Sequence, residues 1–357
     1  MSTRDEGNPA EPVRDEDAFD VEAVAGWLRE HAEAFRDDLD GTPEVGQFPG
    51  GASNLTYLLR YPRRDLILRR PPTGVKAKSA HDMGREFTIQ GALAPVFPYV
   101  ATMVGHCEDE SVIGSEFYVM ERLEGQILRR DLPPTVTTEQ ASELCGHQLD
   151  VLVALHSVDV EAVTALAAMN RGAGYVDRQV EGWTDRLAKA ATDDLGDWSP
   201  VTDWLDEHRQ PDVAQRLIHN DWRFDNMVLG DDLRIVGVLD WEMATVGDPL
   251  MDLGGAMAYW IQDDDDQWFR QFRRQPSNAL GMWTRDEIVA RYCERMRFEM
   301  TPERWRFYEV FGLFRLAVIA QQIWYRYYHG QTHNEAYARF GPAVGQLEQR
   351  CRTLLGL

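Results

Sequence analysis

The sequence predicts an α+β protein, with strands in its first part and mainly helices after them. Three short runs rich in β-branched, aromatic and leucine residues have the length and composition of strands: 55–60, 66–69 and 116–121. Three longer stretches read as helices with apolar residues at helical spacing: 139–155, 284–297 and 302–328. A further helix is expected to begin near residue 81 and to continue to 93. We therefore expect a β-rich N-terminal region and a mainly helical C-terminal region.

The segment 217–226, LIHNDWRFDN, carries the strongest chemical signal. His219, Asp221 and Asn226 fill the frame HxDxxxxN, and the acidic group LDWE follows at 239–242. This arrangement resembles that of protein kinases. In those enzymes an Asp accepts the proton of the substrate hydroxyl, an Asn holds a metal ion, and a later Asp holds Mg²⁺ between the phosphates.

Short apolar strands surround this frame. The sequence predicts strands at 217–218, 227–229 and 235–239, with a turn at 230–232. This order is expected to bring Asp221, Asn226 and Asp240 to one end of a small sheet. The alternative is that the three are ordinary polar residues that cap loops.

The stretch 219–254 resembles the aminoglycoside phosphotransferase and choline kinase family. Gly247-Asp248-Pro249 and Asp252-Leu253 are typical of that family, whereas the DFG motif of protein kinases is absent. The resemblance implies a protein-kinase-like fold of two lobes that uses ATP and Mg²⁺ to phosphorylate a small molecule. It assigns Asp221 as the base, with His219 supporting its loop, and it assigns Asn226 and Asp240 as metal ligands.

Other segments resemble one branch of this family, in which the kinase-like domain occurs alone or fused to acyl-CoA dehydrogenases. The segments are 69–72, 79–83 and 314–319, and the resemblance follows the order of motifs from about residue 40 to 350. No dinucleotide-binding fingerprint is found, so dehydrogenase activity is not expected of these residues.

A glycine-containing turn is expected to contact the phosphates of the nucleotide. Gly50, Gly51, Ser53 and Asn54 precede the strand at 55–60. Glycines allow backbone N–H groups to approach phosphate oxygens, and the Ser and Asn side chains add hydrogen-bond donors. A plain hairpin turn is the alternative. A Walker-type loop is excluded because the chain has no GxxxxGK[ST].

The strand at 66–69 ends in an arginine, where kinases carry a lysine that contacts the phosphates. Lysine cannot fill this position because the chain has only Lys76, Lys78 and Lys189. We expect Arg69 to contact the phosphates as a planar fork of donors and Glu86 to be its carboxylate partner. The alternative is a surface ion pair.

The resemblance also implies a hinge that binds adenine. Met120 resembles the residue that guards the adenine pocket, and the backbone from Glu121 to Leu123 is expected to hydrogen-bond the base. The alternative is that Met120 is simply a core residue. The predicted organisation is a nucleotide lobe over 18–119, a hinge over 120–125 and a catalytic, acceptor-binding lobe over 126–357.

Composition adds expectations about tail, location and partners. Residues 1–17 are acidic and predicted to be disordered. Four widely spaced cysteines without a CxxC pair, and no apolar leader, suggest reduced thiols of a cytoplasmic protein. The net charge of −22 argues against nucleic acid and anionic membranes as partners.

The acceptor is left open between two classes. A hydroxyacyl-CoA or hydroxy acid is suggested by the dehydrogenase-fused branch, and Arg270, Arg273 and Arg274 would suit the phosphates of CoA. An aminoglycoside-type cation is the other class, for which the run 263–266, DDDD, is either a lid or only a solvated loop. A nucleotide-binding pseudokinase is the remaining alternative.

Overall fold

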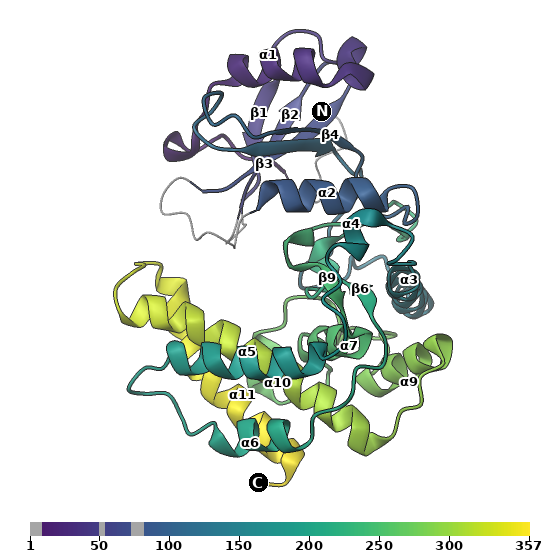
Figure 1. Cartoon of the computed structure of the whole chain (residues 1–357), viewed down its shortest axis with the longest axis vertical. Helices are drawn as coiled ribbons and strands as arrows, with labels where there is room; N and C mark the ends of the chain where they lie inside the picture. The colour runs from purple at the N-terminus through teal and green to yellow at the C-terminus, as the bar shows by residue number, and fades with distance from the viewer. Residues whose placement is uncertain (1–8, 50–53, 73–81) are drawn as a thin grey trace. The chain divides into compact units, whose positions relative to one another are not determined.

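The computed structural model describes residues 9–49, 54–72 and 82–357. It divides into two compact units, each built from several segments (Figure 1). The first comprises Met1–Leu128, Glu161–Leu166 and Phe224–Met243, and the second comprises Arg129–Val160, Ala167–Arg223 and Ala244–Leu357. The first unit therefore includes residues 224–243, which the expected boundaries place in the C-terminal lobe. The expected boundaries themselves remain a prediction.

A five-stranded antiparallel sheet forms the centre of the first unit. Its strands are β1 (Glu44–Gln47), β2 (Leu55–Arg60), β3 (Asp65–Arg70), β4 (Met103–Cys107) and β5 (Phe117–Glu121). The order across the sheet is β1-β2-β3-β5-β4. Arg69 pairs with Thr56 on one side and with Tyr118 on the other, so it lies on a central strand. The three predicted strands are confirmed, and β1 and β4 were not predicted.

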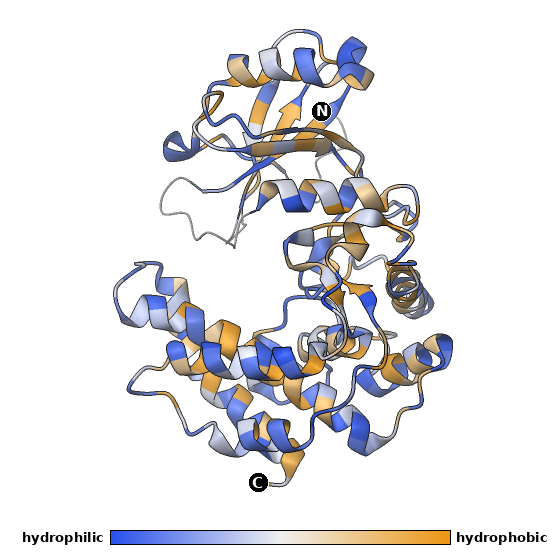
Figure 2. Ribbon diagram, viewed as in Figure 1, coloured by the Kyte–Doolittle hydropathy of each residue, from blue (hydrophilic) through white to orange (hydrophobic). Residues whose placement is uncertain are grey.

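Residues of this sheet alternate between two hydrophobic clusters, as the period of two in a strand requires. One cluster joins Tyr57, Leu68 and Val119 to Val24 and Leu28 of α1 (Val21–His31). The other joins the intervening residues of the same strands to Met83 of α2 (Met83–Leu93). The two helices thus cover opposite faces of the sheet (Figure 1). Figure 2 shows hydrophobic and hydrophilic residues alternating along α1, as expected of an amphipathic helix.

Part of the segment predicted to be disordered packs on this sheet. Glu11 and Gln47 exchange two backbone hydrogen bonds of 2.8 Å, and Asp17 is buried. The Gln47 side chain donates to the Asp17 carboxylate at 2.9 Å. Ordered structure therefore begins before residue 17, which the acidic composition did not reveal.

A two-stranded hairpin completes the first unit. Strands β7 (Met227–Leu229) and β8 (Ile235–Val238) are antiparallel, and Met227 pairs with Val238. Gly125 lies against β7 and has a φ of +150°. A Cβ at this position would collide with the Leu229 carbonyl oxygen. Glycine is therefore required here, where Gln126 forms a bridge with Leu229.

The second unit is mainly helical. Its helices of nine or more residues are α3 (Thr138–His156), α5 (Tyr175–Lys189), α6 (Ser199–Glu207), α7 (Pro249–Ala258), α9 (Arg285–Met296), α10 (Pro302–Tyr328) and α11 (Phe340–Leu355). Gly254 of α7 and Gly312 of α10 allow these two helices to touch, because a Cβ on either would collide with backbone of the other. The three helices predicted for this region are confirmed as α3, α9 and α10.

The prediction of one small sheet around the HxDxxxxN frame is wrong. Strand β6 (Arg216–Ile218) pairs with β9 (Thr245–Gly247), whereas β7 pairs with β8. The strands before and after the frame therefore belong to two separate two-stranded sheets. The strand β9 was not predicted because its three residues, TVG, carry too short a pattern to distinguish from a loop.

Candidate active site

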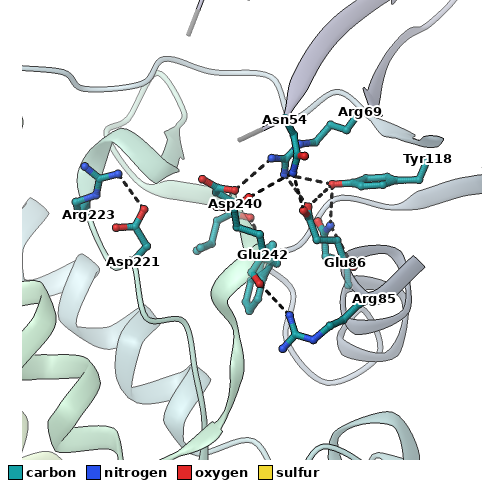
Figure 3. A network of polar contacts seen from close by, with 12 residues as sticks. Asn54, Arg69, Arg85, Glu86, Tyr118, Asp221, Arg223, Asp240 and Glu242 are labelled. Carbon is teal, nitrogen blue, oxygen red and sulfur yellow. Dashed lines mark hydrogen bonds and ion pairs between the residues drawn. The ribbon is translucent and has the colours of Figure 1, made fainter. Parts of the chain in front are cut away.

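A buried ion-pair cluster lies in the first unit, centred on Arg69 (Figure 3). Its Nη1 donates to Glu86 Oε2 at 2.8 Å, and its Nη2 donates to Asp240 Oδ1 at 3.2 Å. The predicted contact of Arg69 with Glu86 is confirmed. The pair is not a surface pair, because Arg69 is 9% exposed and Glu86 is 1% exposed.

Three further side chains complete the hydrogen bonding of this cluster. Asn54 Nδ2 donates to Glu86 Oε1 at 3.1 Å and to Glu242 Oε2 at 3.3 Å. The Tyr118 hydroxyl donates to Glu86 Oε2 at 2.8 Å. Arg85 Nη1 donates to the Glu242 carbonyl oxygen at 2.9 Å. Glu86 thus receives bonds from Arg69 of β3, from Tyr118 of β5 and from Asn54, the residue before β2.

The charges of this cluster are set by burial and by partner groups. Burial lowers the pKa of Arg69, but Tyr118, Glu86 and Asp240 outweigh this and raise it well above its usual value. The guanidinium therefore stays charged. Burial also raises the pKa of Glu86, and the charge of Arg69 opposes that rise. Removing Arg69 would leave a buried carboxylate without its counter-ion, which is costly.

The two expected metal ligands lie at one end of the β7–β8 hairpin. Asn226 directly precedes β7 and closes a short 3-10 turn (Phe224–Asn226), and Asp240 follows β8 by two residues. The Leu239 N–H donates to the Asn226 carbonyl oxygen at 2.8 Å, which continues the ladder one step past the strands. Asp240 has a φ of 64°, in the left-handed region that few non-glycine residues adopt.

The donors of this cluster fit a metal–nucleotide complex. The Arg69 Nε is buried and has no hydrogen-bond partner among the described residues, so a donor remains for a phosphate oxygen. Asp240 and Asn226 offer carboxylate and amide oxygens, the ligands that Mg²⁺ accepts together with water and phosphates. Among the described residues, no three His, Cys, Asp or Glu side chains form a metal-binding group.

The residues of the predicted hinge differ in burial and in backbone hydrogen bonding. Met120 is 6% exposed and packs with Leu58 and Ile67, so it is a core residue, whatever role it has beside a nucleotide. The Glu121 N–H donates to the Thr102 carbonyl oxygen at 2.9 Å. Leu123 makes no backbone hydrogen bond within the described part of the chain, which leaves its peptide groups available. Adenine binding here stays a prediction.

Three of the predicted phosphate-binding residues, Gly50, Gly51 and Ser53, lie outside the described residues. Asn54 is described and is 2% exposed. Its side chain joins two carboxylates, so it supports the cluster in the structure as it stands. A direct bond from Asn54 to phosphate remains a prediction.

The predicted base lies in the second unit, in a loop that is held through its backbone. The Asp252 carboxylate of α7 accepts from the N–H groups of His219 and Asn220, both at 2.8 Å. The Asp221 N–H donates to His219 Nδ1 at 3.3 Å, as expected of a His that supports the loop. Asn220 has a φ of 65°, so the chain turns sharply just before Asp221.

Asp252 is itself anchored by two further buried side chains. His156 Nε2 lies 3.1 Å from the Asp252 carboxylate, and His156 Nδ1 lies 2.6 Å from the Tyr292 hydroxyl. Since a carboxylate only accepts, Nε2 donates to Asp252, and Nδ1 accepts from Tyr292. Burial raises the pKa of Asp252, but the bonds from His156 and from the His219 backbone outweigh it and lower the pKa below its usual value. The sequence did not single out this support.

The Asp221 side chain has a neighbouring cation. Arg223 Nη2 lies 2.9 Å from Asp221 Oδ2, and the guanidinium lies 4.8 Å from the centre of the Tyr259 ring (Figure 3). Arg223 was not predicted as a site residue. The signal was present, because it is two positions from Asp221 within the frame. The pair places a positive charge directly beside the Asp221 carboxylate.

Asp248 has a structural position. It caps α7 by accepting from the N–H of Leu250 at 2.8 Å, and it accepts from the N–H of Val213 at 2.6 Å. Its side chain is fully buried. It therefore fixes the chain at the start of α7, as expected of an Asp before Pro249.

These features define a class of protein: a phosphotransferase of protein-kinase-like fold. Residues 44–288 match the phosphotransferase enzyme family. The chain belongs to that family. The fold is similar to that of a candidate aminoglycoside phosphotransferase from Ralstonia eutropha, with a TM-score of 0.79. It is also similar to that of choline kinase from Cryptosporidium parvum, with a TM-score of 0.64. The Ralstonia eutropha protein is 30% identical in sequence, and the match covers 94% of this chain and 98% of that protein. The choline kinase is 12% identical, and the match covers 94% of this chain and 96% of the kinase.

The curated relatives are longer proteins. Acyl-CoA dehydrogenase family member 11 of Pongo abelii is 31% identical over 93% of this chain and 42% of its own length. Family member 10 of Mus musculus is 34% identical over 92% of this chain and 30% of its own. The chain therefore spans less than half of these relatives, and it resembles the branch that the sequence indicated. An aminoglycoside phosphotransferase of the same fold, 14% identical over 92% of this chain and 98% of its own with a TM-score of 0.57, has been solved with AMP-PNP and hygromycin B. None of the described helices is long and apolar enough to cross a membrane.

Proposed function

We propose that this chain transfers the γ-phosphoryl group of ATP to a hydroxyl group of a hydroxyacyl-CoA thioester or of the corresponding hydroxy acid. The observation that carries the phosphotransfer part is the buried Arg69, shared between Glu86 and Asp240. A cation placed between a fixed carboxylate and a proposed metal ligand suits the phosphates of a nucleotide.

Each residue has a role in this proposal. Asp240 and Asn226 hold Mg²⁺, which neutralises charge on the phosphates when bound. Arg69 donates to phosphate oxygens, and Glu86 keeps its guanidinium in place. Asp221 orients the acceptor hydroxyl and takes its proton, and Arg223 holds the carboxylate in position.

Two points support an acyl thioester as the acceptor: the names of the curated relatives and the chemistry of a phosphorylated hydroxyl. The curated relatives carry the names of acyl-CoA dehydrogenases, so an acyl thioester is a natural substrate for a kinase-like region of such a chain. A phosphorylated hydroxyl is a good leaving group, whereas a free hydroxyl is a poor one. Phosphorylation would therefore prepare a hydroxyacyl chain for a later elimination.

The acidic run does not support an aminoglycoside pocket. Asp265 pairs with Arg285 at 2.7 Å and with Arg350 at 2.9 Å, and its side chain is 8% exposed. Asp266 caps α8 (Gln267–Gln271) by accepting from two backbone N–H groups. These two carboxylates serve the fold. A multiply charged cation would require several carboxylates converging on it, and one run on a loop does not supply them.

The arginines suggested for the CoA phosphates are also partly occupied. Arg273 donates to the Asp131 carboxylate at 2.6 Å and to the Arg130 carbonyl oxygen, and its side chain is 9% exposed. Arg270 lies 3.9 Å from Asp263. Arg273 is therefore held by residues of its own chain and does not serve the CoA phosphates as expected.

The test is a direct competition among acceptors, read as transfer of labelled phosphate from ATP. We expect Mg²⁺-dependent transfer to a hydroxyacyl-CoA and little transfer to kanamycin-type compounds. Transfer to the aminoglycosides alone would contradict the acceptor class and favour the antibiotic kinase. Binding of ATP with neither transfer nor hydrolysis would instead identify a pseudokinase.

A further inference from the structure

A cationic groove lies between the C-terminal ends of α5 and α10 in the second unit. Its volume is about 420 Å³, and its lining is Arg186, Lys189, Ala190, Gln322, Tyr325 and Arg326. Three of these six side chains are cationic and none is acidic, in a chain whose net charge is −22. Such a local reversal of charge attracts anions.

Specific contacts hold the two helices together beside this groove. Gln321 Nε2 donates to the Ala190 carbonyl oxygen at 2.8 Å and to Thr192 Oγ1 at 2.9 Å. Figure 1 shows α5 followed by the loop to α6 on the side where α10 also ends. These two hydrogen bonds fix the end of α5 against α10, and the cations of the groove are exposed side chains on this frame.

Two acidic residues near the groove contact a different face of α10. Asp193 and Asp194 contact Tyr328 and Trp324, respectively. At roughly 100° per residue, Trp324 and Tyr328 project about 160° to 200° away from Arg326 around the helix. The groove residues Gln322, Tyr325 and Arg326 share the remaining face.

The cations of the groove are available for a ligand. Among the described residues, neither Arg186 nor Arg326 pairs with a carboxylate, and Arg186 lies over the Trp183 ring at 4.6 Å. Lys189 contacts Asp185 at 2.5 Å, but both side chains are more than half exposed. An exposed pair one helical turn apart adds little stability and is easily replaced.

The same two helices connect this groove to the loop of the proposed base. Arg315 of α10 donates to the Asn220 carbonyl oxygen at 2.7 Å, next to Asp221, and stacks over Trp183 of α5 at 5.3 Å. From Arg315 to Arg326 the helix rises about 16 Å. The pantetheine arm of CoA has two amides and the length of about four extended residues, roughly 14 Å.

We propose that the α5–α10 groove binds the phosphates at the nucleotide end of a CoA thioester acceptor. This inference rests on the proposed function, because it places the far end of the same substrate. Arg186 and Arg326 supply the bidentate donors that phosphates prefer, and Lys189 adds a third cation. Tyr325, which also lines the groove, offers a ring on which a purine base stacks. The acyl end then extends along α10 toward the Asn220–Asp221 loop.

Direct binding tests this inference without turnover. Calorimetry of the full chain with coenzyme A, with and without the substitutions Arg186→Gln and Arg326→Gln, measures the contribution of each cation. We expect the Kd for coenzyme A to rise about tenfold or more in each variant, while pantetheine binds both variants as it binds the native chain. Arg306→Gln is the matched control, since Arg306 is an exposed arginine at the other end of α10.

Two results would overturn the groove assignment. The first is a native chain that does not bind coenzyme A. The second is a pair of variants with lower Tm but unchanged Kd, because cations in the last turns of helices also stabilise the helix ends.

Steady-state kinetics separate this inference from the proposed function. With a hydroxyacyl-CoA, the groove variants should show a raised KM and a native kcat, and with the matching hydroxyacyl-pantetheine both parameters should stay native. If the native chain transfers phosphate and the variants keep its KM for the CoA thioester, the groove is wrong and the function stands. If coenzyme A binds through the groove but no acyl thioester is phosphorylated, the groove stands and the proposed acceptor fails.

Discussion

The two units hold their candidate catalytic carboxylates in different ways. In the first unit, the Asp240 side chain contacts the buried Arg69, which also pairs with Glu86. In the second unit, the loop of Asp221 is held by its peptide groups, which donate to Asp252. Side-chain charge fixes the first arrangement, and backbone hydrogen bonds fix the second.

This difference predicts how each half responds to substitution. A carboxylate that neutralises a buried cation cannot be removed without changing that cation, because the charges are coupled in a medium of low polarity. A carboxylate carried by a loop with its own backbone anchor can be replaced while the loop stays in place. In the second arrangement the Asp221 side chain pairs with Arg223, while the loop itself is held by backbone hydrogen bonds to Asp252.

The largest effect is expected at Asp221. The substitution Asp221→Asn keeps the shape of the side chain but removes the proton acceptor, so turnover should fall by about 10²- to 10⁴-fold. Because Asp252 holds the loop by its backbone, ATP affinity and Tm should remain native. Steady-state transfer, calorimetry and thermal melting measure these three quantities.

The control for this substitution is Asp232→Asn, since Asp232 is an exposed Asp in the turn after β7, with a side chain 66% exposed. It should behave as the native chain in all three measurements. Near-native transfer by Asp221→Asn would show that another group is the base. A lowered Tm would show that the Asp221 side chain is needed to hold the loop.

An intermediate effect is expected at Asp240. With Asp240→Ala, binding of Mg·ATP should weaken by about 100-fold or more, because the metal loses a carboxylate ligand. Without Mg²⁺ the variant should bind ATP at least as tightly as the native chain, since Arg69 no longer shares its charge with Asp240. Calorimetry with and without Mg²⁺ separates the two effects, and Asp232→Ala serves as the control. An unchanged affinity for Mg·ATP would refute the metal assignment.

The smallest effect is a pH dependence of stability at Asp248. Burial raises the pKa of Asp248 to about 6, from an ordinary value of 3.8. Between these values the folded chain keeps a proton that the unfolded chain has lost, so the contribution of Asp248 is full below pH 4 and is lost as the pH rises through 6.

Comparison with Asp248→Asn isolates this contribution, because asparagine does not titrate. The free energy of unfolding of the native chain should fall relative to that variant as the pH rises from 4 to 7, as measured by urea denaturation. Asp266→Asn is the matched control, since Asp266 also caps a helix but is exposed. A parallel pH profile for the native chain and Asp248→Asn would contradict the raised pKa.

Much of the first unit could be predicted from local patterns. Strands β2 and β5 and helix α2 follow from apolar alternation and from helical spacing, each read within a dozen residues. The Arg69–Glu86 pair was expected from the resemblance to kinases, and it joins β3 to α2, the next element along the chain. The family resemblance supplied the expected order of strand, helix and hinge.

Other parts of the site could not be read from the sequence. Tyr118 looked like one more apolar strand residue, yet its hydroxyl holds Glu86. His156 and Tyr292 are 136 positions apart, and nothing in either local pattern indicates that they meet beneath Asp252. Asp265 and Arg273 looked available for ligands, but each has a partner from a distant segment.

The sequence by itself determined the class of chemistry, because the acceptor, metal and phosphate residues come in short frames whose spacing is local. It also determined most helices and strands, because their periods extend over a few turns or pleats. Only the tertiary structure decided that β6 pairs with β9, that Asn54 bonds to Glu242, 188 positions away, and that Arg186 and Arg326 line one groove. Such pairings depend on which elements pack together, and packing minimises buried, unpaired polar groups over the whole chain, a condition that no short window of sequence contains.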